Sequence, residues 1–311
     1  MPTVADLVED VVATVSPKSR PTYSTGIRLL ARTLADRPLT AVTMAHLEAL
    51  HHQVRQRTGA ATVARARATG RRLPSCDPDS YMRGAAENFV RAARFFFGYA
   101  CKADLLAHSP ADQLRPPRRG KAPERPLTAP ELTDIWQIAT TTGDDPELDG
   151  LLLAFLRHSA ARREGAINLT LDALNGHRRN LVLTEKNGDT RELPTAAWLL
   201  SDLERFARAR GAHRPSDPVL RYRTGAPLTR RRFNTLFDRV DREPGWTEPL
   251  QVGAHWIRHT TLADIAAVSD IRVAAAFAGH QPETLGVIGR DTQVTFDDLF
   301  DAYEAVFGSR D

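Results

Sequence analysis

Cysteine is scarce in this sequence, since only Cys76 and Cys101 occur among 311 residues. Two isolated cysteines provide neither a disulfide framework nor a cysteine-based metal site, because both need several cysteines at short spacings. Long apolar runs are also missing, and none approaches the roughly 20 residues of a membrane-spanning helix. The first residues show no basic segment followed by an apolar run, so no signal peptide is expected. These absences favour a cytoplasmic protein without membrane attachment.

Negative charge is scarce in the first part of the chain. Residues 1–126 contain 20 Lys and Arg against 11 Asp and Glu, a net charge of +9. The remaining residues contain 22 Lys and Arg against 27 Asp and Glu, a net charge of −5. A local excess of cations predicts a surface that meets a polyanion. Arginine outnumbers lysine heavily, which fits phosphate binding by planar guanidinium groups and fits GC-rich coding equally well.

The length and the apolar content of 42% allow two domains, each with its own core. Residues 1–112 show apolar residues at helical spacing and no strand pattern, which predicts a helical bundle. Its longest helix is expected over residues 81–99. Residues 113–126 are basic, rich in proline and without periodicity, which is typical of an extended linker. Residues 127–311 are then expected to form the second domain.

The second domain is predicted to be mostly helical with one β-hairpin. Thr128 and Glu131 form a capping box at the start of a helix. Further helices are expected over residues 148–158, 196–210 and 230–241. The strand pattern is confined to residues 179–194, where Asn187-Gly188 is typical of a hairpin turn and Lys186 lies beside it. The expected fold class is therefore mainly α with a small β-hairpin or sheet.

The stretch from Gly253 to Phe307 indicates the chemistry. His255 and Arg258 are three residues apart on an expected helix, so their side chains share one face. Arginine binds phosphoryl oxygens through paired N–H groups, and histidine adds a donor or exchanges a proton near neutral pH. This pair, followed by Gly279-His280, points to a phosphodiester as the substrate.

With these residues the chain resembles the tyrosine recombinases of the phage-integrase type. That family has H-x-x-R-H, a later Gly-His pair and then a tyrosine nucleophile, and the first two parts match here as His255-Trp256-Ile257-Arg258-His259 and Gly279-His280. The resemblance implies a helical core-binding domain over residues 1–112, a linker over 113–126 and a recombinase-like catalytic domain over 127–311. Two such domains clamp duplex DNA between them.

Two more catalytic positions follow from the resemblance. Aligning Leu169 with the family's leucine puts Arg162 in the slot of the first catalytic arginine, with Arg163 as the alternative. Lys186 corresponds to the hairpin lysine that enters the minor groove and protonates the leaving 5′ oxygen. The implied roles are phosphorane stabilisation by Arg162, Arg258 and His280, and acid–base assistance by His255.

The nucleophile departs from the family pattern. The family phrase R-Y-T-x-V reads Arg290-Asp291-Thr292-Gln293-Val294 here, so Asp291 stands at the nucleophile position. Aspartate is shorter than tyrosine, would form a labile acyl phosphate and repels a DNA phosphate. Tyr303, the only later tyrosine, shares an apolar helical stripe with Leu299 and Phe307 and is expected to pack. One sequence does not separate a natural loss of tyrosine from an introduced substitution.

The resemblance also implies contacts to the DNA backbone. The candidates are Arg55, Arg57, Arg65, Arg67, Arg71, Arg72, Arg118, Arg119, Lys121, Arg230 and Arg231, with Arg221, Arg223 and Arg232 in the same basic group. Solvated helix faces and a solubilising linker are the alternative interpretations of these cations. The expected partner is double-stranded DNA, bound by a homodimer or tetramer, and no cofactor is expected.

Several functions agree with these features. The first is a site-specific recombinase or integrase scaffold that does not complete cleavage, and the alternative is a non-enzymatic DNA-binding protein in regulation, segregation or accessory assembly. Nicking by Asp291 is a third. His255 and His259 are four residues apart, as metal ligands can be, but Trp256 stands where the zinc-protease pattern has glutamate, so no metal is expected.

Overall fold

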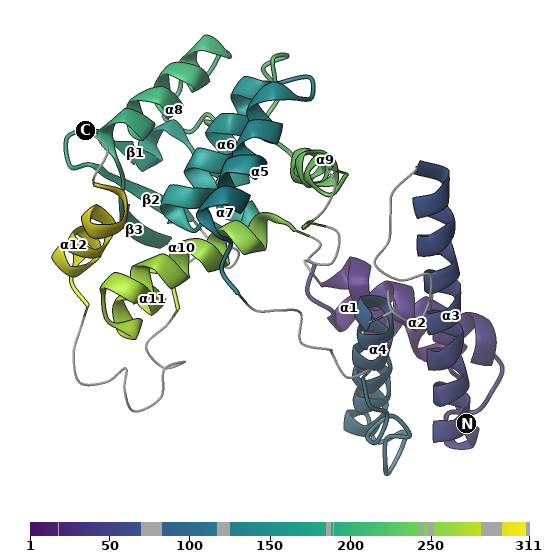
Figure 1. Ribbon diagram of the computed structural model, residues 1–311. Helices are drawn as coiled ribbons and strands as arrows, with labels where there is room; N and C mark the ends of the chain where they lie inside the picture. The colour runs from purple at the N-terminus through teal and green to yellow at the C-terminus, as the bar shows by residue number, and fades with distance from the viewer. Residues whose placement is uncertain are drawn as a thin grey trace. The chain divides into compact units, whose positions relative to one another are not determined.

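In a computed structural model, the chain folds into two compact units, Met1–Ala122 and Pro123–Asp311 (Figure 1). The division falls inside the basic, proline-rich segment. The structure describes residues 1–17, 19–69, 83–116, 125–184, 188, 190–242, 246–247, 252–280 and 294–308.

The first unit is a bundle of helices, as its apolar periodicity predicts. Helices α2 and α4 approach closely because Gly26 has no side chain: a Cβ there would lie 2.5 Å from the Cβ of Ala92. The stripe of α4 that contains Phe89, Phe96 and Phe97 is buried in the core. The elements are the 3-10 helices η1 (Ala5–Leu7) and η2 (Leu39–Ala41) and the α-helices α1 (Val8–Thr14), α2 (Arg20–Leu34), α3 (Met44–Thr69) and α4 (Arg83–Lys102).

Helix α3 continues well beyond the part that its apolar pattern predicts. Met44, Leu47 and Leu50 indicate a helix only as far as about Val54. After that point the residues include many Arg and Ala, which favour a helix without forming an apolar stripe. Hydrophobic periodicity is therefore absent where the helix is exposed, although the backbone stays helical.

The second unit is built around α6, which packs against α5, α7, α8 and α10 (Figure 1). The middle of α6, from Leu148 to Leu156, is almost entirely buried, which explains why its sequence is apolar on every side there. The elements are α5 (Ala129–Thr141), α6 (Pro146–Ser159), α7 (Arg163–Ile167), η4 (Leu171–Ala173), β1 (Leu174–Asn175), β2 (Asn180–Thr184), β3 (Thr190–Pro194), α8 (Ala197–Ala209), α9 (Arg230–Val240), α10 (Ala254–Val268), α11 (Ile271–Phe277) and α12 (Phe296–Phe307).

Strands β1, β2 and β3 form a small antiparallel sheet in that order, so the predicted mainly-α fold with a small sheet is confirmed. The hairpin pairs Leu181 with Leu193 and Leu183 with Arg191. The three leucines are buried and Val182 is exposed, as alternation along a half-buried strand requires. Strand β1 was not predicted, because two residues are too short to show a pattern. Helix α12 packs on β3, α10 and α11.

The predicted capping box at α5 is confirmed. The Thr128 hydroxyl accepts from the backbone N–H of Glu131, whose carboxylate accepts from the N–H of Thr128 at 2.8 Å. Arg125 also donates to this carboxylate at 2.5 Å, and this hydrogen bond is the main reason that the pKa of Glu131 falls to about 2. The chain that enters the second unit is therefore fastened to the start of its first helix.

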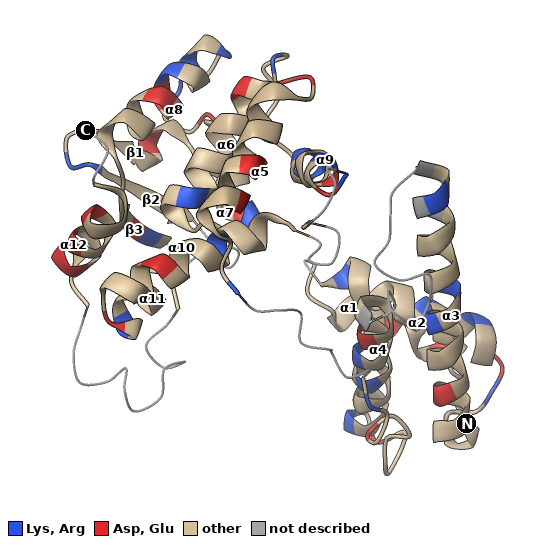
Figure 2. Cartoon of the chain, viewed as in Figure 1, with Lys and Arg blue, Asp and Glu red and all other residues tan. Residues whose placement is uncertain are grey.

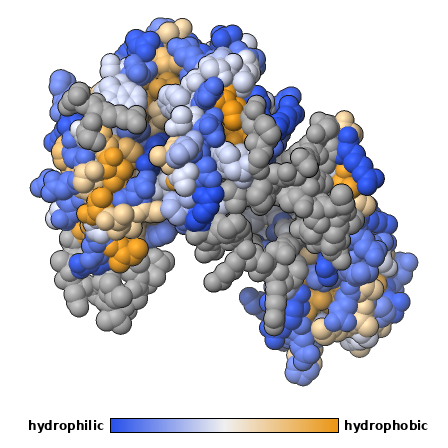
Figure 3. Space-filling view, viewed as in Figure 1, coloured by the Kyte–Doolittle hydropathy of each residue, from blue (hydrophilic) through white to orange (hydrophobic). Residues whose placement is uncertain are grey.

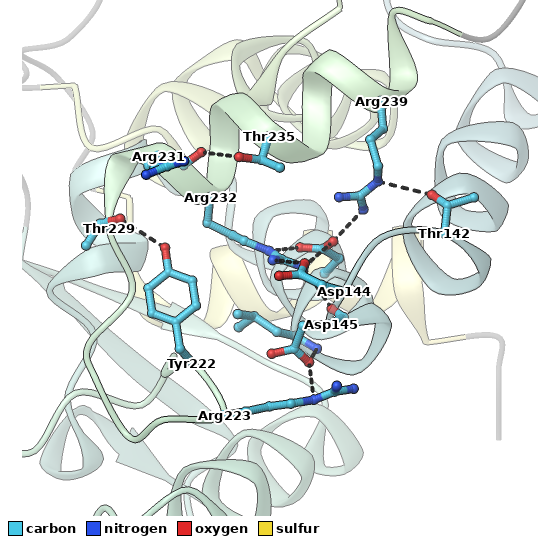
Figure 4. A network of polar contacts seen from close by, with 12 residues as sticks. Thr142, Asp144, Asp145, Tyr222, Arg223, Thr229, Arg231, Arg232, Thr235 and Arg239 are labelled. Atoms are coloured by element: carbon cyan, nitrogen blue, oxygen red, sulfur yellow. Dashed lines mark hydrogen bonds and ion pairs between the residues drawn. The ribbon is translucent and has the colours of Figure 1, made fainter.

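A buried ion-pair network joins α6 to α9 (Figure 4). Asp149 on α6 is fully buried and accepts from Arg232 at 2.6 Å and from Arg239 at 2.5 Å. Arg232 also donates to Asp144 at 2.6 Å and is only 4% exposed. The inclusion of Arg232 among backbone-contacting arginines is therefore wrong, because its charge is compensated inside the protein. Sequence spacing does not reveal this, since the partners are more than eighty residues apart.

The surface of the described chain is mixed. On the face shown in Figure 3, hydrophobic residues form separate patches between hydrophilic ones. None of the helices within the described residues has both the length and the apolar character needed to cross a membrane.

Candidate functional site

The candidate site forms where α6 ends and α7 begins. Ala160 caps α6 in the left-handed conformation, with φ 48° and ψ 32°, which is unfavourable for a residue with a Cβ. Ser159 stabilises the turn, because its hydroxyl donates to the Phe155 carbonyl at 2.5 Å and accepts from the N–H of Ala161 at 3.2 Å. Arg162 follows at the N-cap of α7 and is half-buried. The predicted catalytic arginine therefore follows directly after this turn.

Two arginines from other elements hold this turn. Arg258 on α10 donates to the Ala160 carbonyl and, at 2.7 Å, to the Ala278 carbonyl. Arg191 on β3 donates to the Phe277 carbonyl and, at 3.3 Å, to the Ala160 carbonyl. The end of α6 and the end of α11 are thus joined through guanidinium groups. Carbonyls at helix C-termini lack partners within their own helix and carry partial negative charge, so cationic donors suit them.

The Gly-His pair ends α11 in a Schellman motif. The N–H of Gly279 donates to the Ala276 carbonyl at 2.9 Å, and the N–H of His280 donates to the Ala275 carbonyl at 3.0 Å. Gly279 has φ 68°, and a Cβ there would lie 2.8 Å from Cδ of Arg191. Glycine is required here for the positive φ angle, and because the Arg191 side chain lies where a Cβ would be. His280 leaves this turn with its side chain exposed.

His280 lies in a strongly cationic environment. Its pKa is lowered first by partial burial and then by the charges of Arg258, Arg162 and Arg191. Two of these arginines also contact the turn just before His280: Arg258 donates to the Ala278 carbonyl, and Arg191 passes beside Gly279. The neutral imidazole is favoured near neutral pH, and the surrounding guanidinium groups attract an anion.

His255 lies in a second cationic environment. It projects to the surface from the first turn of α10, whereas its neighbours Trp256 and Ile257 are buried. Its pKa is lowered mainly because the imidazole ring is partly buried, and the charges of Arg163 and His259 lower it further. His255 and Arg258 thus belong to the same helix, but Arg163 is the cation that acts on His255.

The predicted DNA-contacting residues have different surroundings. Arg230 pairs with Glu164 at 2.7 Å while remaining 69% exposed, and Arg231 is exposed beside it on α9. In the first unit, basic residues lie along α3 from its middle onward (Figure 2), where Arg57 and Arg67 are exposed and Arg55 is half-buried. Lys186, Asp291, Arg71, Arg72, Arg118, Arg119 and Lys121, as well as the side chain of Arg65, lie outside the described residues.

Arg191 is a site residue that the sequence interpretation missed. It occupies the same face of β3 as Leu193, and only 9% of its surface is exposed. An arginine at a core-facing position of a strand was the available signal, because a buried guanidinium needs acceptors from the core. Its acceptors are the carbonyls that shape the site.

Tyr303 is buried in the core, as its place on the apolar stripe predicts. Its exposure is 1%, and its hydroxyl accepts from the backbone N–H of Ala196 at 2.8 Å and lies 2.6 Å from Nδ1 of His158. Burial is the main reason that its pKa is raised, which disfavours the phenolate.

Within the described part of the chain, no group of three or more His, Cys, Asp and Glu side chains is arranged to hold a metal ion.

The role of Gly279 can be tested with Gly279→Ala. We expect the free energy of unfolding of the second unit to fall by about 2 kcal/mol, because alanine is strained at φ 68° and its Cβ meets Arg191. All four tryptophans lie in the second unit, so urea unfolding followed by tryptophan fluorescence reports on that unit. Gly176→Ala is the control, since nothing lies within 4 Å of a Cβ at that position. Equal stability of the two variants would contradict the steric explanation.

Comparison with known proteins identifies the family. Residues 125–285 match the model of the Phage integrase family. Tyrosine recombinase XerD of Mycobacterium tuberculosis is 28% identical over 233 residues, covering 67% of this chain and 71% of that protein. Tyrosine recombinase XerC of Alcanivorax borkumensis is 25% identical over 125 residues, which covers 40% of this chain and 41% of that protein's length.

A solved structure shares the fold. A lambda integrase dimer bound to a COC′ core site superposes with a TM-score of 0.65 at 16% identity, covering 94% of this chain and 80% of that chain. The family model matches more than half of the chain, from the start of the second unit to just beyond His280. This chain therefore belongs to the phage integrase family.

Proposed function

We propose that this protein binds duplex DNA at specific sites and holds one backbone phosphate with Arg162, Arg258 and His280. The proposal rests on the surroundings of His280: Arg258 and Arg191 donate to the carbonyls of Ala278 and Phe277 just before it, and the charge of Arg162 also acts on its imidazole. Guanidinium groups from separate elements, fixed by hydrogen bonds before any ligand arrives, provide a preorganised site for a phosphodiester. Family membership and the DNA complex of the lambda integrase dimer support this choice of anion.

The same site has the parts needed to stabilise a phosphoryl-transfer transition state. Arginine donors and a histidine N–H match the charge that develops on the non-bridging oxygens of a phosphorane. His255, kept neutral near pH 7 by its surroundings, is suited to accept a proton from an attacking group. Lys186 is assigned the protonation of the leaving 5′ oxygen on the family pattern alone.

We infer that the covalent step of the family is not completed by this chain. Asp291 stands where the family has tyrosine, and its carboxylate would repel the bound phosphate. Tyr303 does not replace the missing nucleophile, because its hydroxyl is bound to Ala196 and His158 within the core. The protein is then a recombinase scaffold that binds without cutting, or a DNA-binding protein with a regulatory, segregation or accessory role.

The wider DNA contacts are assigned to exposed cations in both units. Arg57 and Arg67 on α3 and Arg231 on α9 reach the surface, and the exposed ion pair of Arg230 with Glu164 is weak enough for a phosphate to compete. Arg55, Arg65, Arg71, Arg72, Arg118, Arg119 and Lys121 complete the proposed set. We also propose that the protein acts in the cytoplasm as a dimer or tetramer on paired half-sites.

Binding is tested by selecting duplexes from a random DNA pool and measuring the affinity for the enriched sequence. Arg258→Ala is expected to weaken this affinity by roughly tenfold or more, because a charge-assisted contact to phosphate is lost. Arg208→Ala is the control, since Arg208 is an exposed arginine on α8 that pairs within its own helix with Glu204. Circular dichroism and tryptophan fluorescence verify the fold of both variants. No enrichment by the wild-type protein, or equal affinity of the two variants, would contradict the proposal.

The missing nucleophile is tested with Asp291→Tyr on a nicked suicide substrate that contains the selected site. The wild-type chain is expected to bind without forming a covalent adduct, because aspartate stands at the position of the tyrosine nucleophile. The Asp291→Tyr variant is expected to form one, visible as a shifted band after denaturing electrophoresis. An adduct with the wild-type chain would overturn the proposed inactivity. Binding by the variant without an adduct would favour the non-enzymatic alternative.

The contact of His280 predicts a pH dependence of binding. Its pKa is lowered in the free protein, and a bound phosphate would raise it, so the complex holds more protons than the free protein. Affinity should therefore increase as the pH falls, by roughly two- to tenfold between pH 8 and pH 6. Fluorescence anisotropy at constant ionic strength measures this change. His280→Asn should flatten the profile, and an unchanged profile would exclude His280 as the titrating contact.

A further inference from the structure

The first turn of α7 contains two consecutive arginines with different surroundings. Arg162 is the extended N-cap residue and Arg163 is the first helical residue. The charge of Arg162 acts on His280, whereas the charge of Arg163 acts on His255. The two residues are therefore not alternative occupants of one position, although the sequence alone treats them so.

Arg163 is held at the surface by α9. Its NH1 donates to Oδ1 of Asn234 at 3.1 Å, and its guanidinium carbon lies 5.8 Å from the centre of the Phe233 ring. It also lies beside His255: a Cβ placed on Gly253 would be 3.2 Å from Nδ1 of His255 and 4.0 Å from NH2 of Arg163. The Arg163 guanidinium and the His255 imidazole thus both lie close to Gly253, which has no side chain to separate them.

The positive charge of Arg163 is not compensated locally. Among the residues that the structure describes, no carboxylate lies within 4.0 Å of its guanidinium, and Asn234 is a neutral acceptor. Arg230, on the same helix as Asn234, differs in this respect because it pairs with Glu164. A guanidinium oriented by an amide keeps its charge and its remaining N–H groups for an anion.

We propose that Arg163, oriented by Asn234, binds a second DNA phosphate, the neighbour on the His255 side of the phosphate held by Arg162, Arg258 and His280. This inference rests on the proposed function. It extends the site from one phosphate to two consecutive phosphates of one strand. The separate cationic environments of His280 and His255 support two positions for anions instead of one.

The test replaces single phosphates of the selected duplex by neutral methylphosphonates and combines each replacement with protein variants. Arg163→Gln is expected to weaken binding to unmodified DNA by roughly tenfold and to lower the slope of log affinity against log salt by about one. At one phosphate position, the methylphosphonate should weaken binding by the wild-type protein but should not weaken binding by Arg163→Gln any further. Arg258→Ala should likewise be insensitive to a methylphosphonate at one position. These two phosphate positions should be adjacent.

Three other variants separate charge from structure. Arg163→Lys keeps the charge and should retain part of the affinity, and Asn234→Ala should lose affinity at the same phosphate as Arg163→Gln. Arg208→Gln should bind like the wild-type protein. The proposal is overturned if Arg163→Gln binds normally, if its loss is equal at every modified phosphate, or if it couples to the same phosphate as Arg258. Failure of the wild-type protein to bind any selected duplex would overturn the proposed function together with this inference.

Discussion

The site depends on hydrogen bonds between arginine side chains and the backbone carbonyls at the ends of two helices. Helix C-termini leave carbonyls without partners inside the helix, and buried carbonyls must find donors elsewhere. Arg258 and Arg191 supply donors to the ends of α6 and α11 at once. The left-handed turn at Ala160 and the Schellman turn at Gly279 are held in place by the same two side chains. Arg162 and His280 follow directly after these two turns.

The type of acceptor distinguishes arginines with different roles in the second unit. Arg232 and Arg239 bind the buried carboxylate of Asp149, so their charges serve to join α9 to α6. A buried ion pair of this kind stabilises little relative to an apolar contact, but it leaves a large penalty when one partner is removed. Arg163 is held instead by an amide oxygen at the surface. The network of α9 thereby fixes the helix that orients Arg163, which links a structural ion pair to the proposed phosphate site.

In the proposed function, the aspartate at the nucleophile position removes the covalent step without removing the capacity of the arginines to bind a phosphate. Arginines that stabilise a phosphorane also bind the ground-state phosphodiester, whereas the covalent step needs a nucleophile in addition. The buried hydroxyl of Tyr303 helps to hold α12 against the core, because it hydrogen-bonds to the backbone N–H of Ala196 and to the ring of His158.

The order of helices, the hairpin and the capping box at α5 could be predicted, because each depends on neighbouring residues and on periodicity. The family motifs also placed Arg162, Arg258 and His280 in order, since those motifs are short and local. The exposed half of α3 was missed because no buried face marks it. Arg191, Arg232 and the separate environments of Arg162 and Arg163 were decided only by the tertiary structure. The hydrogen-bond partners of Arg191, Arg232 and Arg163 are carbonyls, carboxylates and an amide far away in the chain. A side chain's charge becomes structural or functional only when folding determines which acceptor it meets.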